Sequence, residues 1–158
     1  MSRPIRALIH PEALRHNYSI IRRHAGEAKL WAVVKANAYG HGLLRAAQAL
    51  AGAADGFAVL EMAEAQALRS AGLAQPILLL EGFFSADDLP AIAELGLTPV
   101  IHSRRQLQWL EESRLARPIP VYLKLNSGMN RLGLPAADVA QALLRLARLP
   151  QVAGVTLD

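Results

Sequence analysis

Trp31-Ala-Val-Val-Lys-Ala-Asn-Ala-Tyr-Gly-His-Gly42 is the segment from which the fold and function of this chain are predicted. Residues 32–34 form a short apolar run of the kind found in a strand buried on both faces. The run stops at Lys35, and two glycines follow within seven residues. Parallel α/β folds place their active sites at the carboxyl ends of such strands. The alternative for Lys35 is a strand-end lysine whose ammonium extends to water.

The same pattern of apolar strand, turn and helix recurs on both sides of this segment. A short strand at 5–9 and an amphipathic helix at 11–25 precede it. The predicted strands from this segment onward are 29–35, 56–60, 76–80, 98–101, 119–125 and 152–157. The predicted helices between them are 43–51, 61–71, 86–95, one that begins after Ser103, and 136–149. Strand centres roughly 20–30 residues apart suit parallel strands joined by helical crossovers.

Two closed architectures fit this alternation: a doubly wound open sheet and a (β/α)₈ barrel. The first strand is not followed by a Gly-x-Gly-x-x-Gly motif, which weakens the dinucleotide-binding version of the open sheet. At 158 residues the chain has the length of one domain. Nothing in its composition marks a linker or a low-complexity segment.

Composition and charge exclude several classes of protein. The chain has no cysteine, so we expect no disulfide and no thiolate metal site. No apolar run approaches the ~20 residues that span a bilayer, and no signal core follows the basic N-terminus, so we expect a cytoplasmic protein and no membrane partner. The net charge is +4, but the arginines are scattered and no nucleic-acid motif is present. A solvated basic surface is therefore favoured over nucleic-acid binding.

Two motifs carry a resemblance to a known family. Residues 33–42, Val-Val-Lys-Ala-Asn-Ala-Tyr-Gly-His-Gly, resemble the cofactor-lysine motif of the alanine racemases, which use pyridoxal 5'-phosphate (PLP). Residues 122–133, Tyr-Leu-Lys-Leu-Asn-Ser-Gly-Met-Asn-Arg-Leu-Gly, resemble that family's other signature in the same half of the chain. The sequence of residues 126–131, together with Glu-Gly-Phe-Phe at 81–84, is most similar to that of the catabolic branch of the family.

The resemblance implies a PLP-binding (β/α)₈ TIM-type barrel. Family members are more than twice as long as this chain, so we expect a barrel truncated after about five βα units plus the start of a sixth strand. On this interpretation residues 1–158 are the N-terminal part of the PLP-binding barrel domain, and the second half of the barrel and a C-terminal β-domain are absent.

The resemblance also assigns roles to three side chains. Lys35 is implied to anchor PLP through a Schiff base and to act as the base that faces the α-proton of the D-enantiomer. Tyr39 is implied to contact the cofactor phosphate, although a packed ring is its ordinary alternative. Arg131 is implied to reach the cofactor's phenolic oxygen and the substrate carboxylate, whereas without the resemblance it would be a surface arginine.

Lys124 is a fourth candidate, because many family members carry a carbamylated lysine at the matching position. The neighbouring aspartate of the family is Asn126 here. An unmodified Lys124 near Arg131 would instead place two like charges together and require an anion between them.

The other polar residues rank lower as site candidates. His41 and His102 follow predicted strands, and a structural role is favoured for both. His10, His16 and His24 lack the spacing of a metal site, so no metal is predicted. Glu81 has no second carboxylate placed to work with it, and Met129 could either line the site or fill a gap.

The resemblance implies a function for the whole protein: interconversion of L-alanine and D-alanine by a homodimer. The family's second base is a tyrosine from a later region, supplied by the partner subunit, so we expect no two-base racemase activity from this chain alone. Three alternatives stay open: another PLP enzyme of the same barrel class, such as an amino-acid decarboxylase; a non-catalytic PLP-binding barrel protein; and a fragment with no ligand.

Overall fold

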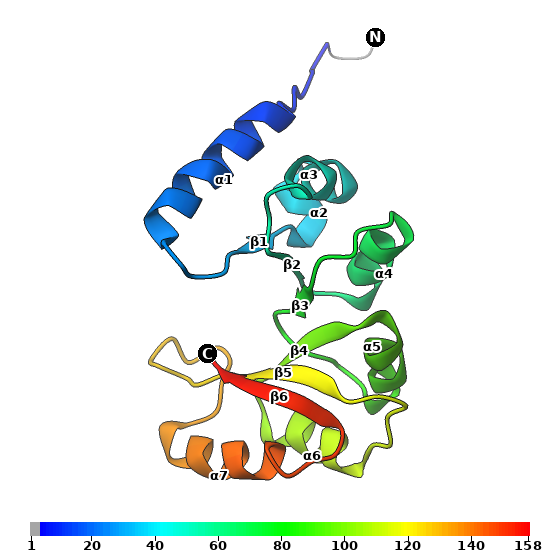
Figure 1. Cartoon of the computed structure of the whole chain (residues 1–158), viewed down its shortest axis with the longest axis vertical. Coiled ribbons are helices and arrows are strands. Elements are labelled where there is room, and N and C mark those ends of the chain that lie inside the picture. The colour runs from blue at the N-terminus through cyan, green and yellow to red at the C-terminus, as the bar shows by residue number, and fades with distance from the viewer. Residues whose placement is uncertain (1–3) are drawn as a thin grey trace.

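Six parallel strands form one curved sheet in the computed structural model, which describes residues 4–158 (Figure 1). In chain order they are β1 (Trp31–Val33), β2 (Gly56–Val59), β3 (Ile77–Leu79), β4 (Leu97–Ile101), β5 (Ile119–Leu123) and β6 (Val152–Leu157). Each strand lies beside the next one in the chain, so the sheet order is β1-β2-β3-β4-β5-β6. A doubly wound sheet reverses its strand order at a switch point, and this sheet does not. The topology is therefore that of a (β/α)₈ barrel, of which residues 4–158 supply six strands.

The helices lie along the outer side of the curved sheet (Figure 1). They are α1 (Pro11–Ala25), α3 (Leu43–Leu50), α4 (Met62–Ser70), η1 (Ala86–Asp88), α5 (Leu89–Leu95), α6 (Arg104–Glu112) and α7 (Ala136–Leu146). The short segment α2 (Lys35–Tyr39) is a left-handed turn that follows β1. Strands β2, β3 and β4 are buried at every position, as expected for parallel strands covered on both faces. None of the helices in residues 4–158 has the length and apolar character needed to cross a membrane.

Apolar side chains pack on both faces of the sheet. The larger cluster fills the space between the sheet and the helices, where Phe57, Ile77 and Leu79 are fully buried. A smaller cluster covers the inner face and consists of Ala58, Leu78 and Val100, with Trp31 and Tyr122 packed against it. Alternating strand positions therefore supply the two clusters, as the pleat of a strand requires.

A contact between the first and fifth strands shows that the sheet is strongly curved. The ring centroids of Trp31 and Tyr122 are 6.2 Å apart in an edge-to-face arrangement, and Trp31 Nε1 donates to the Tyr122 hydroxyl at 3.3 Å. Four strand spacings in a flat sheet would separate β1 from β5 by about 19 Å. The two side chains meet because the sheet curls around its inner face, as a barrel wall does.

Gly56 makes room for the Trp31 ring on this inner face. A Cβ atom built on Gly56 would lie 2.3 Å from Trp31 Cζ3 and 2.9 Å from the Pro76 carbonyl oxygen. Trp31 and Gly56 are also register partners in the β1–β2 ladder. The large ring and the missing side chain therefore fit each other across neighbouring strands.

The strand predicted at 5–9 is wrong. These residues form no secondary structure, and Ile5 and Leu8 are 78% and 75% exposed. Their alternation is typical of a strand, but within the described residues no neighbouring strand pairs with them. The six later strands are confirmed, and none of their ends shifts by more than two residues. The predicted strand 29–35, for example, is reduced to Trp31–Val33.

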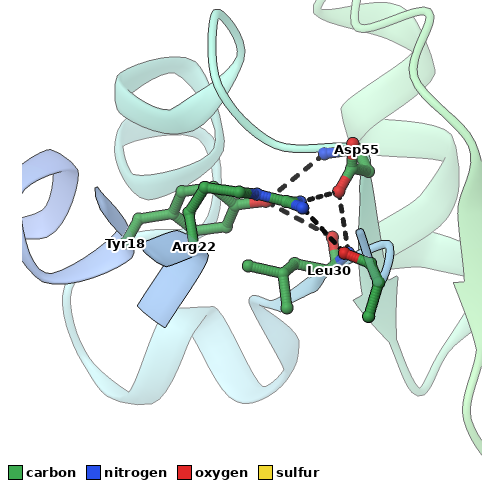
Figure 2. Close-up of polar contacts among 5 residues, drawn as sticks. Tyr18, Arg22, Leu30 and Asp55 are labelled. Atoms are coloured by element: carbon green, nitrogen blue, oxygen red, sulfur yellow. Dashed lines mark hydrogen bonds and ion pairs between the residues drawn. The ribbon is translucent and has the colours of Figure 1, made fainter. Parts of the chain in front are cut away.

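A polar cluster joins α1 to the amino ends of β1 and β2 (Figure 2). The Asp55 carboxylate accepts from the Leu30 N–H at 2.7 Å and from the Arg22 guanidinium. Arg22 also donates to the Ala28 carbonyl at 2.7 Å. The Tyr18 hydroxyl lies 3.4 Å from both the Leu30 carbonyl oxygen and the Asp55 nitrogen. This cluster lies at the opposite end of the strands from Lys35 and serves to attach α1.

We predict that Asp55 makes the stability of the chain depend on acid. The Leu30 N–H, with the Arg22 guanidinium beside it, lowers the pKa of the Asp55 carboxyl. Its contribution to the free energy of unfolding is therefore present above the ordinary pKa of about 3.9 and is lost as the pH falls through the lowered folded-state pKa. Urea midpoints measured from pH 6 to pH 3 should fall less steeply for Asp55→Asn than for the unsubstituted chain. Parallel slopes would contradict this assignment.

We also predict that positions 31 and 56 are energetically coupled. Gly56→Ala should destabilise the chain by about 1–3 kcal/mol, because the added methyl group meets the Trp31 ring. In the Trp31→Ala background the same substitution should cost less, because the ring is gone. Chemical unfolding of the two single variants and the double variant measures this coupling. Additive costs would show that the two positions are independent.

Candidate functional site

Four of the predicted polar side chains follow the carboxyl ends of strands. Lys35 and Glu81 each come two residues after the end of β1 and β3, and His102 and Lys124 directly follow β4 and β5. Because the strands are parallel, these residues lie along one edge of the sheet. This is the edge at which barrel enzymes carry their active sites.

Lys35 is a half-buried cation without a carboxylate partner. None of the ion pairs formed by residues 4–158 includes its ammonium. It follows Val34, whose N–H still donates to the Ala58 carbonyl of β2 at 2.9 Å, so the ladder holds the chain up to the residue before the lysine. The backbone at Lys35 is thus held in place, whereas the ammonium at the end of its side chain has no ion-pair partner among residues 4–158.

The turn after Lys35 is left-handed, which the sequence did not predict. Residues 36–39 have φ values of 52°, 55°, 51° and 54°, and none of them is a glycine. Left-handed backbone costs about 1–2 kcal/mol per L-residue, and such segments persist only where their surroundings hold them. Here Ala38 N–H donates to the Val34 carbonyl at 2.9 Å, and the Asn37 side-chain oxygen accepts from Leu43 N–H at 2.9 Å.

Gly40 and Gly42 complete this turn. Their φ values are 92° and 93°, a region that glycine enters without strain. Both N–H groups donate to the Asn37 carbonyl, at 3.1 and 2.9 Å. His41 lies between them, and its Nδ1 is 2.8 Å from the Ala38 carbonyl oxygen, which agrees with the structural role expected for it.

A carboxylate from α4 contacts the same turn. Glu64 accepts from the Ala36 N–H at 2.7 Å, and its other oxygen accepts from Leu60 and Glu61 N–H at 3.0 and 3.3 Å. Sequence reasoning missed Glu64 as a site residue. The spacing of Glu61 and Glu64 is that of a capping box at a helix start, but nothing in that spacing points to the lysine turn.

Tyr39 ends the left-handed turn with its ring in solvent. It is 64% exposed, so the ordinary alternative of a packed ring does not hold in residues 4–158.

Arg131 lies in an exposed loop after β5 that is organised by Asn126. The Asn126 side-chain oxygen accepts from Gly128 and Asn130 N–H at 3.0 and 3.1 Å, and its amide donates to Asn130 Oδ1 at 2.9 Å. The loop closes on Gly133 (φ 109°), where a Cβ atom would lie 2.6 Å from the Asn126 nitrogen. Asn126 therefore shapes the loop that carries the arginine.

Lys124 has an anionic partner that sequence reasoning did not identify. Its ammonium donates to Asp158 Oδ2 at 2.6 Å, and the backbones of the two segments also bond, through Asp158 N–H to the Leu123 carbonyl at 2.9 Å. Asp158 follows β6, which pairs with β5. Lys124 is thus paired with a carboxylate at the end of the neighbouring strand.

His102 is half-buried and hydrogen-bonded to the loop after β3. Its Nε2 lies 3.0 Å from the Glu81 carbonyl oxygen, which can only accept, so this nitrogen carries a proton. The buried Gln106 accepts from His102 N–H at 2.9 Å and donates to the Glu81 and Phe83 carbonyls at 3.0 Å each. These bonds fix the loop after β3. Among residues 4–158 no three His, Asp or Glu side chains gather closely enough to hold a metal ion.

Lys35 follows the carboxyl end of β1, whereas Arg131 lies in the exposed loop after β5. Three strands lie between β1 and β5 in the sheet. The Trp31–Tyr122 contact nevertheless joins side chains of β1 and β5 across the inner face. A cavity of about 370 Å³ opens at the amino ends of the strands, lined in part by Trp31, Tyr122 and Asp55. Lys35, Tyr39 and Arg131 do not line this cavity; Lys35 and Tyr39 follow the opposite, carboxyl end of β1.

We predict that Asn126 keeps the Arg131 loop ordered. Asn126→Ala removes the acceptor of two backbone N–H groups, so the amides of Gly128 and Asn130 should exchange with solvent at least about tenfold faster. Asn126→Asp is the matched control, because it keeps the accepting oxygen and should leave that exchange near its original rate. Hydrogen–deuterium exchange at residues 127–131 measures the difference. Equal exchange in the two variants would contradict the role of the acceptor.

Comparison with known proteins places these features in a family. The family model described as "Alanine racemase, N-terminal domain" matches residues 9–157. A curated alanine racemase from Leptothrix cholodnii is 53% identical over 157 residues, which cover 99% of this chain and 41% of that protein. One from Nitrosospira multiformis is also 53% identical and is covered over 44% of its length.

Solved structures agree with the sequence matches. The biosynthetic alanine racemase from Pseudomonas aeruginosa superposes with a TM-score of 0.91 at 40% identity, over 94% of this chain and 42% of that one. The alanine racemase from Bacillus anthracis with bound L-Ala-P superposes with a TM-score of 0.77 at 28% identity, over 95% of this chain and 39% of that one. The chain therefore spans less than half the length of each of these four proteins.

Proposed function

This chain belongs to the alanine racemase family, and on that premise we propose that it forms the cofactor-lysine part of a PLP-dependent alanine racemase. The whole protein would interconvert L-alanine and D-alanine as a homodimer. Residues 1–158 would be the N-terminal part of its PLP-binding barrel domain. The observation that carries the proposal is Lys35: a lysine without a counter-ion, at the carboxyl end of a barrel strand, inside the family's lysine motif.

The side chains at this edge suit the chemical groups of PLP. The cofactor carries an aldehyde, a phosphate and a phenolic oxygen, and it supplies an electron sink that makes the α-proton of a bound amino acid acidic. Lys35 offers an amine to the aldehyde, and Tyr39 offers an exposed hydroxyl to the phosphate. Arg131, exposed and outside every ion pair formed by residues 4–158, offers a planar guanidinium to anionic oxygens. Lys124 is already paired with Asp158 and adds little unbalanced charge.

These side chains divide the work of a proton transfer at the substrate α-carbon. Lys35 would hold the cofactor and then, once displaced by substrate, move the proton on the face of the D-enantiomer. Arg131 would bind the substrate carboxylate and so orient the α-carbon toward that amine. The second base, on the other face, is assigned by the family resemblance to a tyrosine of a later region. Residues 1–158 would therefore supply one of the two bases.

The choice between a catabolic and a biosynthetic role does not follow from this site. The wording of residues 126–131 favours the catabolic branch, whereas the Pseudomonas aeruginosa relative is a biosynthetic enzyme. The side chains discussed above serve the same reaction in either role. Carbamylation of Lys124 likewise stays a prediction; in this structure its side-chain nitrogen donates to Asp158.

We predict that PLP reacts at Lys35 and not at the other lysines. The chain has three lysines: Lys29, Lys35 and Lys124. Incubation of the purified chain with PLP, reduction with borohydride and peptide mass spectrometry should locate the label at Lys35. Lys35→Arg should lose the label, because a guanidinium does not react with the aldehyde. Lys29→Arg is the matched control at the amino end of the same strand, and it should label as before. Equal labelling of all three lysines would refute the proposed site.

A further inference from the structure

Glu64 connects the lysine turn to the neighbouring strand through its two carboxylate oxygens. Its Oε1 accepts from the Ala36 N–H at 2.7 Å, and Ala36 is the residue directly after Lys35. Its Oε2 accepts from Leu60 N–H at 3.0 Å, one residue beyond the end of β2. One side chain therefore links the residue after Lys35 to the carboxyl end of the next strand.

The Ala36 N–H needs this acceptor because the local backbone does not provide one. The β1–β2 ladder ends at Val34, whose N–H is the last of this segment to donate to β2. The intrahelical type of bond begins only at Ala38, which donates to Val34. Lys35 and Ala36 lie between the two patterns, at the point where φ becomes positive. Glu64 thus supplies a hydrogen bond at the point where the backbone φ changes to positive values.

Glu64 does this without neutralising the lysine. No ion pair within residues 4–158 joins its carboxylate to the Lys35 ammonium. All three of its described bonds go to backbone N–H groups. The charge therefore fixes the backbone on which the lysine stands and leaves the amine free for an aldehyde.

We propose that Glu64 is a positioning residue for Lys35, which holds the left-handed turn so that the amine stays at the carboxyl end of β1. What the amine does there rests on the proposed function. The positioning itself rests on the hydrogen bonds described above. The competing explanation is that Glu64 only caps α4, since it also forms a capping box with Glu61.

Two substitutions at position 64 test the proposal. Glu64→Gln keeps the shape but has one accepting oxygen, so it cannot serve both Ala36 and Leu60. Glu64→Asp keeps the charge at the start of α4, which maintains the helix, but it is too short to reach both groups. Glu61→Ala is the matched control, because it breaks the same capping box and leaves the contact with Ala36 intact. Circular dichroism confirms that each variant used is folded.

The first measurement is hydrogen exchange at the Ala36 amide, which needs no cofactor. We expect it to be about tenfold faster or more in Glu64→Gln and Glu64→Asp, the factor for loss of a bond to a charged acceptor, and nearly unchanged in Glu61→Ala. The second measurement is the rate at which PLP is fixed to Lys35 by borohydride, together with the pH dependence of that rate. Both should change in the Glu64 variants and stay as in the unsubstituted chain in Glu61→Ala.

Each result decides the matter. Equal effects in all three variants, or none in the Glu64 variants, would overturn the proposal and leave helix capping as the role of Glu64. If the unsubstituted chain fixes no PLP at Lys35, the proposed function fails, and Ala36 exchange alone decides the positioning role. Faster exchange confined to the Glu64 variants would then support it, and unchanged exchange would overturn it.

Discussion

The contact between Trp31 and Tyr122 is the constraint on which the arrangement of this chain depends. It joins the first strand to the fifth across the inner face. In a flat sheet these two strands would be about four strand spacings apart. Gly56 permits it, because any side chain there would occupy the space of the indole. Once the sheet is curled in this way, the segments after β1 and β5 follow the same end of the strands.

The two ends of the strands have different duties. At the amino ends, Tyr18, Arg22 and Asp55 attach α1, and Arg69 donates to the carbonyls of Leu73 and Gln75 at 2.7 and 2.8 Å. These contacts stabilise the fold. At the carboxyl ends, the backbone is strained over residues 36–39 and two cations lack partners among the residues described. Barrel proteins separate stability from chemistry in this manner.

Periodicity was sufficient to predict six strands and most helices, because these elements bury regular apolar patterns. It failed at residues 5–9, where alternation is present but a partner strand is not. The motif at 33–42 identified Lys35 and the two glycines after it. Ala36 and Tyr39 have no intrinsic preference for positive φ, so the handedness of the turn could not be predicted from the sequence. Glu64 and Asp158 were missed because their partners are distant in sequence and are brought close only by the sheet.

The left-handed turn has a consequence for how easily this segment can be replaced by evolution. Its backbone is the mirror image of an ordinary helical turn, so achiral glycine would enter it without penalty. Glycine would also leave it as easily, because it has many other conformations of similar energy. Alanine, asparagine and tyrosine have fewer alternative backbone conformations. Residues 36–39 therefore adopt an unfavourable backbone with few alternatives, and this limits the range of positions open to the neighbouring Lys35.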